Sequence, residues 1–372
     1  MLSYRSPRIQ QDFEDDVATF PQLTVSKTEI RRIGRELQSQ LPDDASMMDR
    51  HAEVFRIAYG WRNAHFFPMR MMRRELGRIS KTVCKDVLTA GRLKRMNSIR
   101  MKLRSSSTKL ERMQDLGGCR AILNTPASVQ SIIEKYRSGT SRHELSREAD
   151  YITHPRASGY RSHHFVMRYR AKNEAEAQFD GLQIELQVRT INQHAWATAV
   201  EAIGLITGFD LKHENGDQRW VQFFDAMSAD IAEEEGCPVV ERWSNRRHRR
   251  EAIKSLASDL NVSRQLEQCA HAVHALQHRV GEKSRYYTMR FDPLTKTVSI
   301  RGYIAPDLGA KSAALQESQF RTMDSVLVDV DRADNLRKAY PNYFLDVGLF
   351  NRHITRIVKG YDPIYLYEYT RA

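Results

Sequence analysis

The sequence lacks the features that mark disulfide-bonded, secreted or membrane-spanning proteins. Its 372 residues include only four cysteines, with no Cys-x-x-Cys pair, so no disulfide framework is expected. No apolar run approaches the roughly 18 residues of a membrane span. The N-terminal residues have no apolar core after their basic residues, so no signal peptide is expected either. We therefore expect a cytoplasmic protein without a membrane partner.

Glycine-rich phosphate-binding loops are also absent, because neither G-x-x-x-x-G-K-[ST] nor G-x-G-x-x-G occurs. If the protein handles nucleotides, side chains must hold the phosphates. The net charge of +12 at pH 7 does indicate partners that carry phosphate. This charge is concentrated in residues 56–112, which hold sixteen Lys and Arg against three Asp and Glu. A second basic run, 242–250, is typical of a solvated helix face.

The chain is long enough for two domains with cores of their own. Pro238 and the arginine run that follows it mark the expected boundary. We expect a first domain over 1–235 and a smaller α+β domain over 236–372, which begins with a long helix at about 250–281. Three histidines of that helix share one face, but no second ligand cluster accompanies them, so a zinc site is not expected.

The segment GRLKRMNSIRMKL (91–103) contains the candidate phosphate ligands. The pattern predicts a short basic helix over 92–103, with two cations at its start and three polar residues on one face. Arginine offers a planar fork and lysine a mobile point charge, a combination that suits a triphosphate. The candidates are Arg92, Lys94, Arg95, Ser98 and Lys102.

Two carboxylates are candidate metal ligands. Asp115 precedes a Gly-Gly turn into an apolar strand, and Glu185 alternates with Gln187 and Arg189 on one face of another strand. A carboxylate pair on neighbouring strands, facing a basic helix, is a recurring way to hold Mg²⁺ on substrate phosphates. The alternative is that these residues form the solvent-exposed face of a sheet.

A loop between the two carboxylates presents a candidate base-stacking residue. Pro155 and Gly159 shape the loop, Tyr160 follows them, and His164 lies at the start of the next strand. An exposed aromatic ring beside a basic pocket can stack on a nucleobase. Alternatively, Tyr160 anchors the loop.

Five motifs occur in one order: GRLKRMNSIRMKL, DLGGCR, YITHPRASGYRSHH, IELQVRT and QHAWATAVEAIG. Together they resemble the synthetase domain of the RelA/SpoT family over about 92–204. The resemblance implies an α/β (α+β) fold, in which a mixed sheet flanked by helices is similar to that of nucleotidyltransferases. It also implies a pyrophosphokinase that uses ATP and Mg²⁺ and acts on a 3′-hydroxyl. No His-Asp dipeptide occurs, so the hydrolase half of bifunctional relatives is not expected.

The resemblance assigns roles at the matching positions. Arg92, Lys94 and Lys102 would bind the ATP phosphates. Asp115 would hold Mg²⁺, and Glu185 would hold the metal or act as general base. The acceptor site would contain Tyr160, His164, Gln187, Arg189 and His194. His194 stands where related small synthetases often have an asparagine that contacts the base, which leaves guanine specificity open.

The segment VLVDVDRADNLRKAYPNYFLDVGLF (326–350) resembles a phage-defence (CapRel-like) branch, in which a toxic small alarmone synthetase is fused to its own antitoxin. The resemblance implies that Tyr340 and Tyr343 block the ATP pocket until a phage protein binds the C-terminal domain. It further implies that the acceptor is the 3′ end of tRNA. Alternatively, both tyrosines are ordinary core or turn residues around Pro341.

Three functions therefore remain open from the sequence. The first is an autoinhibited pyrophosphokinase that modifies tRNA. The second is a small alarmone synthetase that makes (p)ppGpp, or an adenosine analogue, from ATP and a free nucleotide such as GDP or GTP. The third is a catalytically inactive nucleic-acid-binding protein, although the joint presence of Arg92, Lys94, Asp115 and Glu185 speaks against it.

Overall fold

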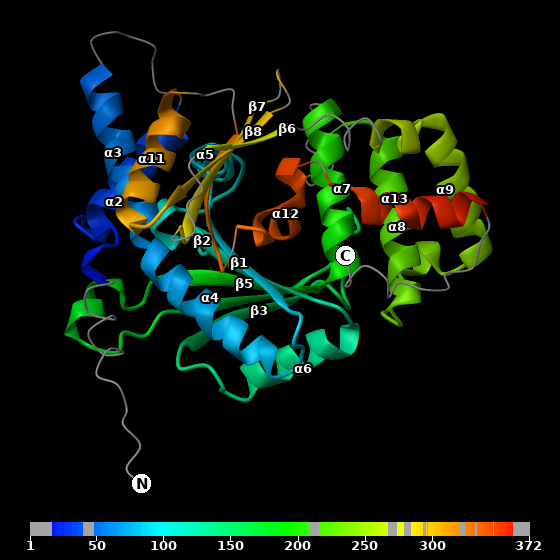
Figure 1. Cartoon of the computed structure of the whole chain (residues 1–372), viewed down its shortest axis with the longest axis horizontal. Helices are drawn as coiled ribbons and strands as arrows, with labels where there is room; N and C mark the ends of the chain where they lie inside the picture. The colour runs from blue at the N-terminus through cyan, green and yellow to red at the C-terminus, as the bar shows by residue number, and fades with distance from the viewer. Residues whose placement is uncertain are drawn as a thin grey trace.

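Nine β-strands form one mixed sheet with helices on both faces in the part of the chain that the computed structural model describes (Figure 1). The described residues are 17–39, 48–207, 216–266, 274–278, 284–292, 295, 297–319, 324–331, 333–344 and 346–359. The strands are β1 (Leu88–Leu93), β2 (Gly117–Leu123), β3 (Glu144–Asp150), β4 (His163–Arg168), β5 (Gln183–Thr190), β6 (His274–His278), β7 (Tyr286–Asp292), β8 (Thr297–Tyr303) and β9 (Asp324–Val330). The predicted fold class is confirmed.

The helices of the first half are α2 (Lys27–Gln38), α3 (Met48–Ala64), α4 (Phe66–Lys81), α5 (Met96–Ser105), η2 (Leu110–Arg112), α6 (Pro126–Arg137), η3 (Glu174–Phe179), α7 (Ile191–Thr207) and α8 (Gln218–Glu234). Those of the second half are η5 (Glu241–Trp243), α9 (Arg246–Asp259), α11 (Pro306–Gln319), α12 (Asn335–Ala339), η6 (Pro341–Phe344) and α13 (Gly348–Lys359). No described helix is long and apolar enough to cross a membrane.

The sheet runs through both halves of the chain. Its order is β3-β4-β5-β2-β1-β9-β7-β8-β6, with β2–β5 and β6–β8 parallel and the other neighbours antiparallel. The junction lies between β1 and β9, where Gly91 pairs with Asp329. The described strands of 236–372 therefore extend the sheet of 1–235 rather than building a second one. The proposed boundary falls in the turn after α8, and the division into two domains stays a prediction.

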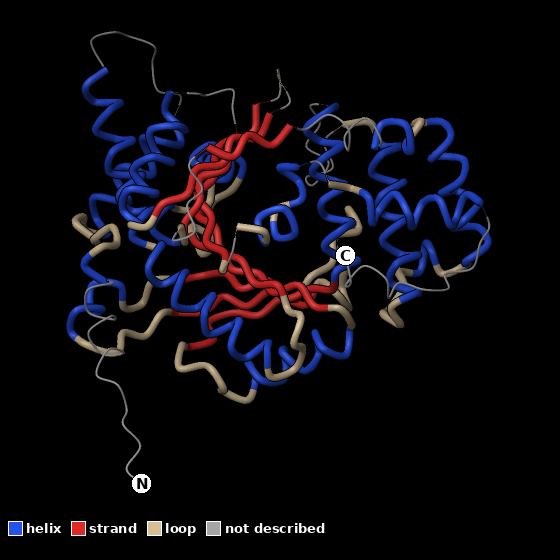
Figure 2. Tube along the Cα trace, viewed as in Figure 1, coloured by secondary structure: helices blue, strands red, loops and turns tan. Residues whose placement is uncertain are grey.

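Two hydrophobic cores lie on opposite faces of this sheet. Strand alternation sends neighbouring residues to opposite faces, so Leu327 of β9 joins one core while Val326 and Val328 join the other. The first core contains side chains of α2 to α6 and α11, and the second contains those of α7 to α9, α12 and α13. Figure 2 shows α12 within the concave side of the curved sheet.

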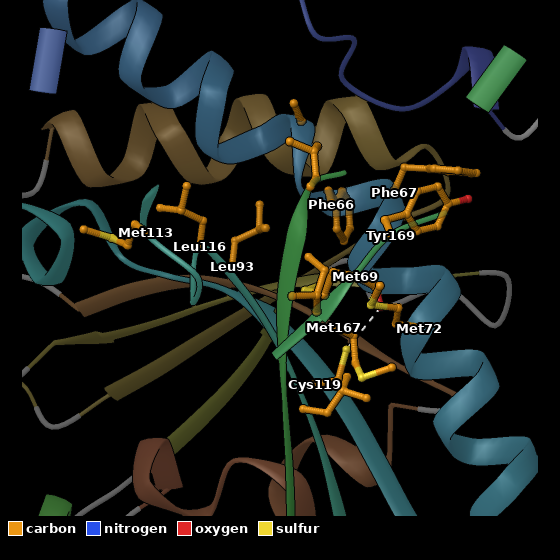
Figure 3. Close-up of a cluster of buried hydrophobic side chains, with 14 of the residues drawn as sticks. Phe66, Phe67, Met69, Met72, Leu93, Met113, Leu116, Cys119, Met167 and Tyr169 are labelled. Carbon is orange, nitrogen blue, oxygen red and sulfur yellow. Dashed lines mark hydrogen bonds between the residues drawn. The ribbon is translucent and has the colours of Figure 1, made fainter. Parts of the chain in front are cut away.

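Close packing of α4 on β2 fixes the strand that follows Asp115. Met69 and Cys119 lie together in this core (Figure 3), and the Cys119 thiol donates a hydrogen bond to the Met69 carbonyl oxygen at 3.2 Å. A Cβ at Gly117 would lie 2.8 Å from Cδ1 of Ile184 and 3.2 Å from Cβ of Met69. Glycine is thus required for helix and strand to approach this closely.

The structure corrects the helix predicted at the start of the second half. The long helix expected at 250–281 is wrong, because α9 ends at Asp259, Asn261 has a left-handed φ of 48°, and 274–278 form β6. His274 and His278 therefore lie on a strand, while His271 lies outside the described residues. No cluster of three or more His, Cys, Asp or Glu that could hold a metal ion is found among the described residues.

Candidate active site

Two lysines converge on Asp115 at the end of the sheet. Lys94 follows β1 and Lys102 lies on α5, and the Nζ atoms of both donate to Oδ2 of Asp115 at 2.9 Å. The other carboxylate oxygen, Oδ1, is buried and has no hydrogen-bond partner. One carboxylate thus faces two ammonium groups, which leaves the cluster with an excess of positive charge.

The candidate phosphate ligands come from a strand as well as a helix. Arg92 lies on β1 and Arg95 is the N-cap of α5, so the prediction of a single helix from residue 92 is wrong. Ser98 is half-buried on α5, one turn before Lys102, as the helical spacing predicts. The chain changes from strand to helix between Leu93 and Met96, so the candidates lie on both sides of this junction.

The second carboxylate is held by a relay of hydrogen bonds. Glu185 lies opposite Gly118 where β5 runs parallel to β2. Its Oε1 is 3.0 Å from Nδ1 of His164, and its Oε2 accepts from Nε2 of Gln187 at 2.7 Å. The Nε2 atom of His164 lies 2.9 Å from the hydroxyl of Tyr160. The structure therefore brings together the four predicted residues of this group.

The relay shifts the pKa of each of its three titratable members. Burial would raise the pKa of Glu185, but the hydrogen bond and charge of His164 outweigh it and lower that pKa to about 2. Burial would likewise lower the pKa of His164, but its contacts with Tyr160 and Glu185 raise it to about 9. The pKa of Tyr160 falls to about 8, because the charges of His164 and Arg189 outweigh burial. At pH 7 an imidazolium therefore bridges a carboxylate and a neutral phenol.

A glycine positions the loop that carries Tyr160. Gly159 has φ of +86°, and a Cβ there would lie 2.9 Å from Cα of Asp225 in α8. The Ser228 hydroxyl donates to the carbonyl oxygen of Gly159, and Arg161, 3% exposed, donates to that hydroxyl. The loop is thus packed against α8 and holds Tyr160 beside His164.

Three arginines on neighbouring strands form a positive cluster beside the relay. They are Arg92 on β1, Arg120 on β2 and Arg189 on β5. Burial and then the charge of Arg120 lower the pKa of Arg189 to about 10. Burial and then the charge of Arg92 lower the pKa of Arg120. Arg120 was missed by the sequence reasoning, although it is the one charge within the apolar strand GGCRAIL.

His194 lies within this cluster and is neutral. Its Nδ1 accepts a hydrogen bond from Nη2 of Arg189, so its Nε2 carries the proton and donates to the carbonyl oxygen of Lys338 at 3.3 Å. Burial and the charge of Arg189 hold its pKa well below the usual value. In this structure His194 therefore contacts Arg189 and α12 rather than an open base-binding surface.

Tyr340 and Tyr343 of residues 326–350, the C-terminal segment, cover the arginine cluster. The hydroxyl of Tyr340 donates to the carbonyl oxygen of Gly91 at 2.8 Å, and its ring lies under the guanidinium of Arg120. The Tyr343 hydroxyl lies within reach of the positive charges of Arg95 and Arg92, and it has no hydrogen-bond partner. Each tyrosine is 1% exposed. The two side chains therefore lie beside Arg92, Arg95 and Arg120.

Several cations that the sequence left without a role point into the molecule. Three arginines of 56–112 attach the second half of the chain to α3 and α4. The contacts are Arg62 with Glu317 at 2.5 Å, Arg70 with the ring of Tyr286 at 4.8 Å, and Arg73 with Asp329 and Asp331 at 2.7 Å each.

The run 242–250 is only partly a solvated face. Arg247 is largely exposed, but four other arginines of the run pair with carboxylates of α8. These pairs are Arg242 with Asp225, Arg246 with Glu233, Arg249 with Asp230 and Glu233, and Arg250 with Asp230 and Glu234. The run therefore joins α9 and its preceding turn to α8.

Residues 91–204 match the family model described as "Region found in RelA / SpoT proteins". We refer to residues 91–204 as the RelA/SpoT region because of this match. This region contains every predicted phosphate, metal and acceptor residue, so the resemblance read from the five motifs is confirmed over these residues. Tyr340 and Tyr343 lie outside the RelA/SpoT region, and Tyr340 contacts it at Gly91 and Arg120.

Individual proteins resemble the RelA/SpoT region as well. A curated relative, the GTP pyrophosphokinase YjbM of Bacillus subtilis, is 32% identical over 111 residues, which are 29% of this chain. The match spans 51% of that protein, about half of its length.

Two solved structures show a weaker overall likeness. The Bacillus subtilis small alarmone synthetase 1 bound to its product pppGpp has a TM-score of 0.41 at 20% identity, covering 50% of this chain and 94% of the other. A GTP pyrophosphokinase family protein from Streptococcus pneumoniae has a TM-score of 0.38 at 22% identity, covering 52% of this chain and 93% of the other. Both scores lie below 0.5.

Proposed function

We propose that this protein is an ATP-dependent pyrophosphokinase of the RelA/SpoT type. The observation that carries the proposal is the convergence, within residues 91–204, of a cation cluster around Asp115 and an ionised Glu185 held by His164. Such a site can neutralise several phosphate charges and orient a hydroxyl, which is most of what phosphoryl-type transfer requires.

In the proposed reaction the acceptor 3′-oxygen attacks the β-phosphorus of ATP. The bond from that phosphorus to the α,β-bridging oxygen breaks, AMP leaves, and the hydroxyl proton is released. Arg92, Lys94 and Lys102 supply positive charge for the phosphates, and the two lysines can exchange Asp115 for phosphate oxygens. The cations thereby stabilise the charge that develops on the leaving oxygen.

The two carboxylates fit a magnesium ion by their chemistry. Asp115 offers a buried oxygen without a hydrogen bond, and Glu185 stays ionised at a pKa of about 2. Asp115 and Glu185 would hold the ion, which when bound would neutralise phosphate charge. A carboxylate with so low a pKa accepts a proton poorly, so we favour metal binding over general-base catalysis for Glu185.

We further propose that the acceptor is the 3′ end of tRNA. Arg62, Arg70 and Arg73 no longer support an RNA surface, because they point inward. Eight cations of 56–112 remain exposed, and four of them, Arg74, Arg78, Lys81 and Lys85, form a stripe on and just after α4. This stripe supports contact with a phosphate backbone. Guanosine nucleotides are the second candidate, favoured by the activity named for the curated relative.

The acceptor is tested with ATP labelled in its γ-phosphate. Purified protein is incubated with bulk tRNA, with GDP and with GTP, and the products are separated by size. We expect label in tRNA, and no label after periodate has destroyed the terminal ribose diol. The Glu185→Gln variant serves as the inactive control. Label that enters the nucleotides and never tRNA contradicts the tRNA proposal and supports the second candidate.

We also propose that the C-terminal segment keeps the enzyme inactive until a partner binds it. Burial of Tyr340 and Tyr343 over Arg92 and Arg120 supports this proposal, because ATP could not reach these arginines while both rings are in place. A phage protein as the partner stays a prediction.

A further inference from the structure

Glu317 of α11 links two elements of the first half of the chain. Its Oε1 accepts a hydrogen bond from Nη1 of Arg62 on α3 at 2.5 Å, and its Oε2 accepts from the backbone N–H of Met96 at 2.8 Å. The side chain of Glu317 is 10% exposed and that of Arg62 only 2%. Both contacts are therefore shielded from water and weakly screened by salt.

Met96 is the first residue of α5, the helix that carries Ser98 and Lys102. The first N–H groups of a helix have no partner within the helix and carry partial positive charge. Arg95, the N-cap of α5, forms no capping hydrogen bond through its side chain. Glu317 supplies the missing acceptor, and it does so as an anion. A phosphate oxygen would satisfy the same N–H group in the same way.

The guanidinium of Arg62 is also held by contacts that do not involve Glu317. Its Nε and Nη2 both donate to Oδ1 of Asn63 at 3.1 Å, and it lies 4.9 Å from the ring centre of Tyr59. Departure of Glu317 would therefore leave a fixed, buried positive charge next to an uncapped helix end. An anion would be strongly favoured at that position.

We propose that Glu317 is an internal competitor for the phosphate of ATP at the N-terminus of α5. While α11 is docked, the carboxylate occupies this position, and a phosphate oxygen takes it when α11 moves away. This inference rests on the proposed function and adds a second autoinhibitory contact at the same site. The two tyrosines cover Arg92 and Arg120 from α12 and η6, whereas Glu317 reaches α5 from another helix.

The proposal predicts a specific effect of removing one charge. Glu317→Gln keeps the size of the side chain but removes the anion that competes with phosphate. Asp307→Asn is the matched control, because Asp307 lies on the same helix in an exposed ion pair with Lys311 at 3.2 Å. Titration calorimetry of the full-length proteins with α,β-methylene ATP measures the difference. We expect about three- to tenfold tighter binding for Glu317→Gln and no change for Asp307→Asn.

Two further variants keep the outcome interpretable. Glu317→Ala removes both hydrogen bonds and should bind the analogue at least as tightly as Glu317→Gln; it replaces that variant if Gln prevents folding. Tyr340→Ala with Tyr343→Ala opens the site independently. If this double variant binds the analogue more tightly but the Glu317 variants bind like the unaltered protein, competition between Glu317 and the ATP phosphate is contradicted. If no variant binds the analogue, both the proposed ATP site and the proposed competition by Glu317 are contradicted.

Discussion

The guanidinium of Arg120 lies 5.2 Å from the ring centre of Tyr340, and its Nη1 donates to the carbonyl oxygen of the preceding Ala339 at 3.2 Å. Arg120 belongs to the RelA/SpoT region and Tyr340 to the C-terminal segment, so the pair joins the proposed catalytic and inhibitory parts. A desolvated cation–π contact of this kind contributes about 2 kcal/mol.

Replacing both tyrosines by alanine should activate the enzyme. Tyr340→Ala with Tyr343→Ala removes the rings that cover Arg92 and Arg120, and we expect transfer activity to rise about tenfold or more, since loss of about 1.4 kcal/mol shifts a closed–open equilibrium tenfold. Growth of cells that express the variant should slow. Tyr343→Phe is the control, because the hydroxyl it removes makes no hydrogen bond. Equal activity of the double variant and the unaltered protein would argue against autoinhibition.

Neutralising Glu185 should abolish transfer and lower the pKa of His164. Glu185 helps to hold the pKa of His164 near 9, so in Glu185→Gln the imidazole should titrate at lower pH. Proton NMR of the His164 ring measures this shift, and the label assay measures the activity. The two readouts together separate a local electrostatic change from unfolding. An unchanged His164 titration would contradict the relay described above.

The relay also predicts how stability depends on pH. His164 has a raised pKa, so its contribution to stability is fully present below about pH 6.5 and is lost as pH rises toward 9. Glu185 has a lowered pKa, so its contribution is present above about pH 4.5 and is lost as pH falls toward 2. Urea unfolding of the protein and of His164→Gln should differ most near pH 6. A difference that grows between pH 7 and 9 would contradict this account.

Removing Arg73 should loosen the attachment of β9 to α4. Asp329 is 2% exposed, so Arg73→Met leaves a buried carboxylate without its partner, which we expect to destabilise the fold by about 3 kcal/mol. Arg73→Met combined with Asp329→Asn should recover part of the loss. Arg78→Gln changes an exposed residue of the same helix and should have an effect near zero. Urea unfolding compares the four proteins, and equal midpoints for Arg73→Met and Arg78→Gln would refute the prediction.

Strands and helices that are determined by a local residue pattern could be predicted from the sequence. The alternation around Glu185 and the apolar run after Gly118 gave strands, and the helix that opens at Ile191 follows β5 directly. The helical spacing within 92–103 also placed Arg92 on that helix, whereas it lies on β1, because the sequence does not show where strand becomes helix. Tertiary pairing with β2 and β9 decides this point.

Long-range pairing could not be predicted in the same way. The register of Gly91 against Asp329 joins residues more than two hundred positions apart, and no local signal specifies it. The same holds for Arg62 and Glu317, whose side chains are polar in the sequence and nearly buried in the structure. Counting charges predicted a basic surface, whereas folding uses several of those charges as internal partners.

The central claim is that this protein is a pyrophosphokinase that its own C-terminal segment holds inactive. The most direct test follows the γ-label of ATP in the Tyr340→Ala/Tyr343→Ala variant, with and without Glu185→Gln. We predict that label enters an acceptor bearing a free 3′-hydroxyl faster than in the unaltered protein, and that Glu185→Gln stops the transfer. Absence of label from tRNA and from nucleotides in the folded double variant would contradict the claim.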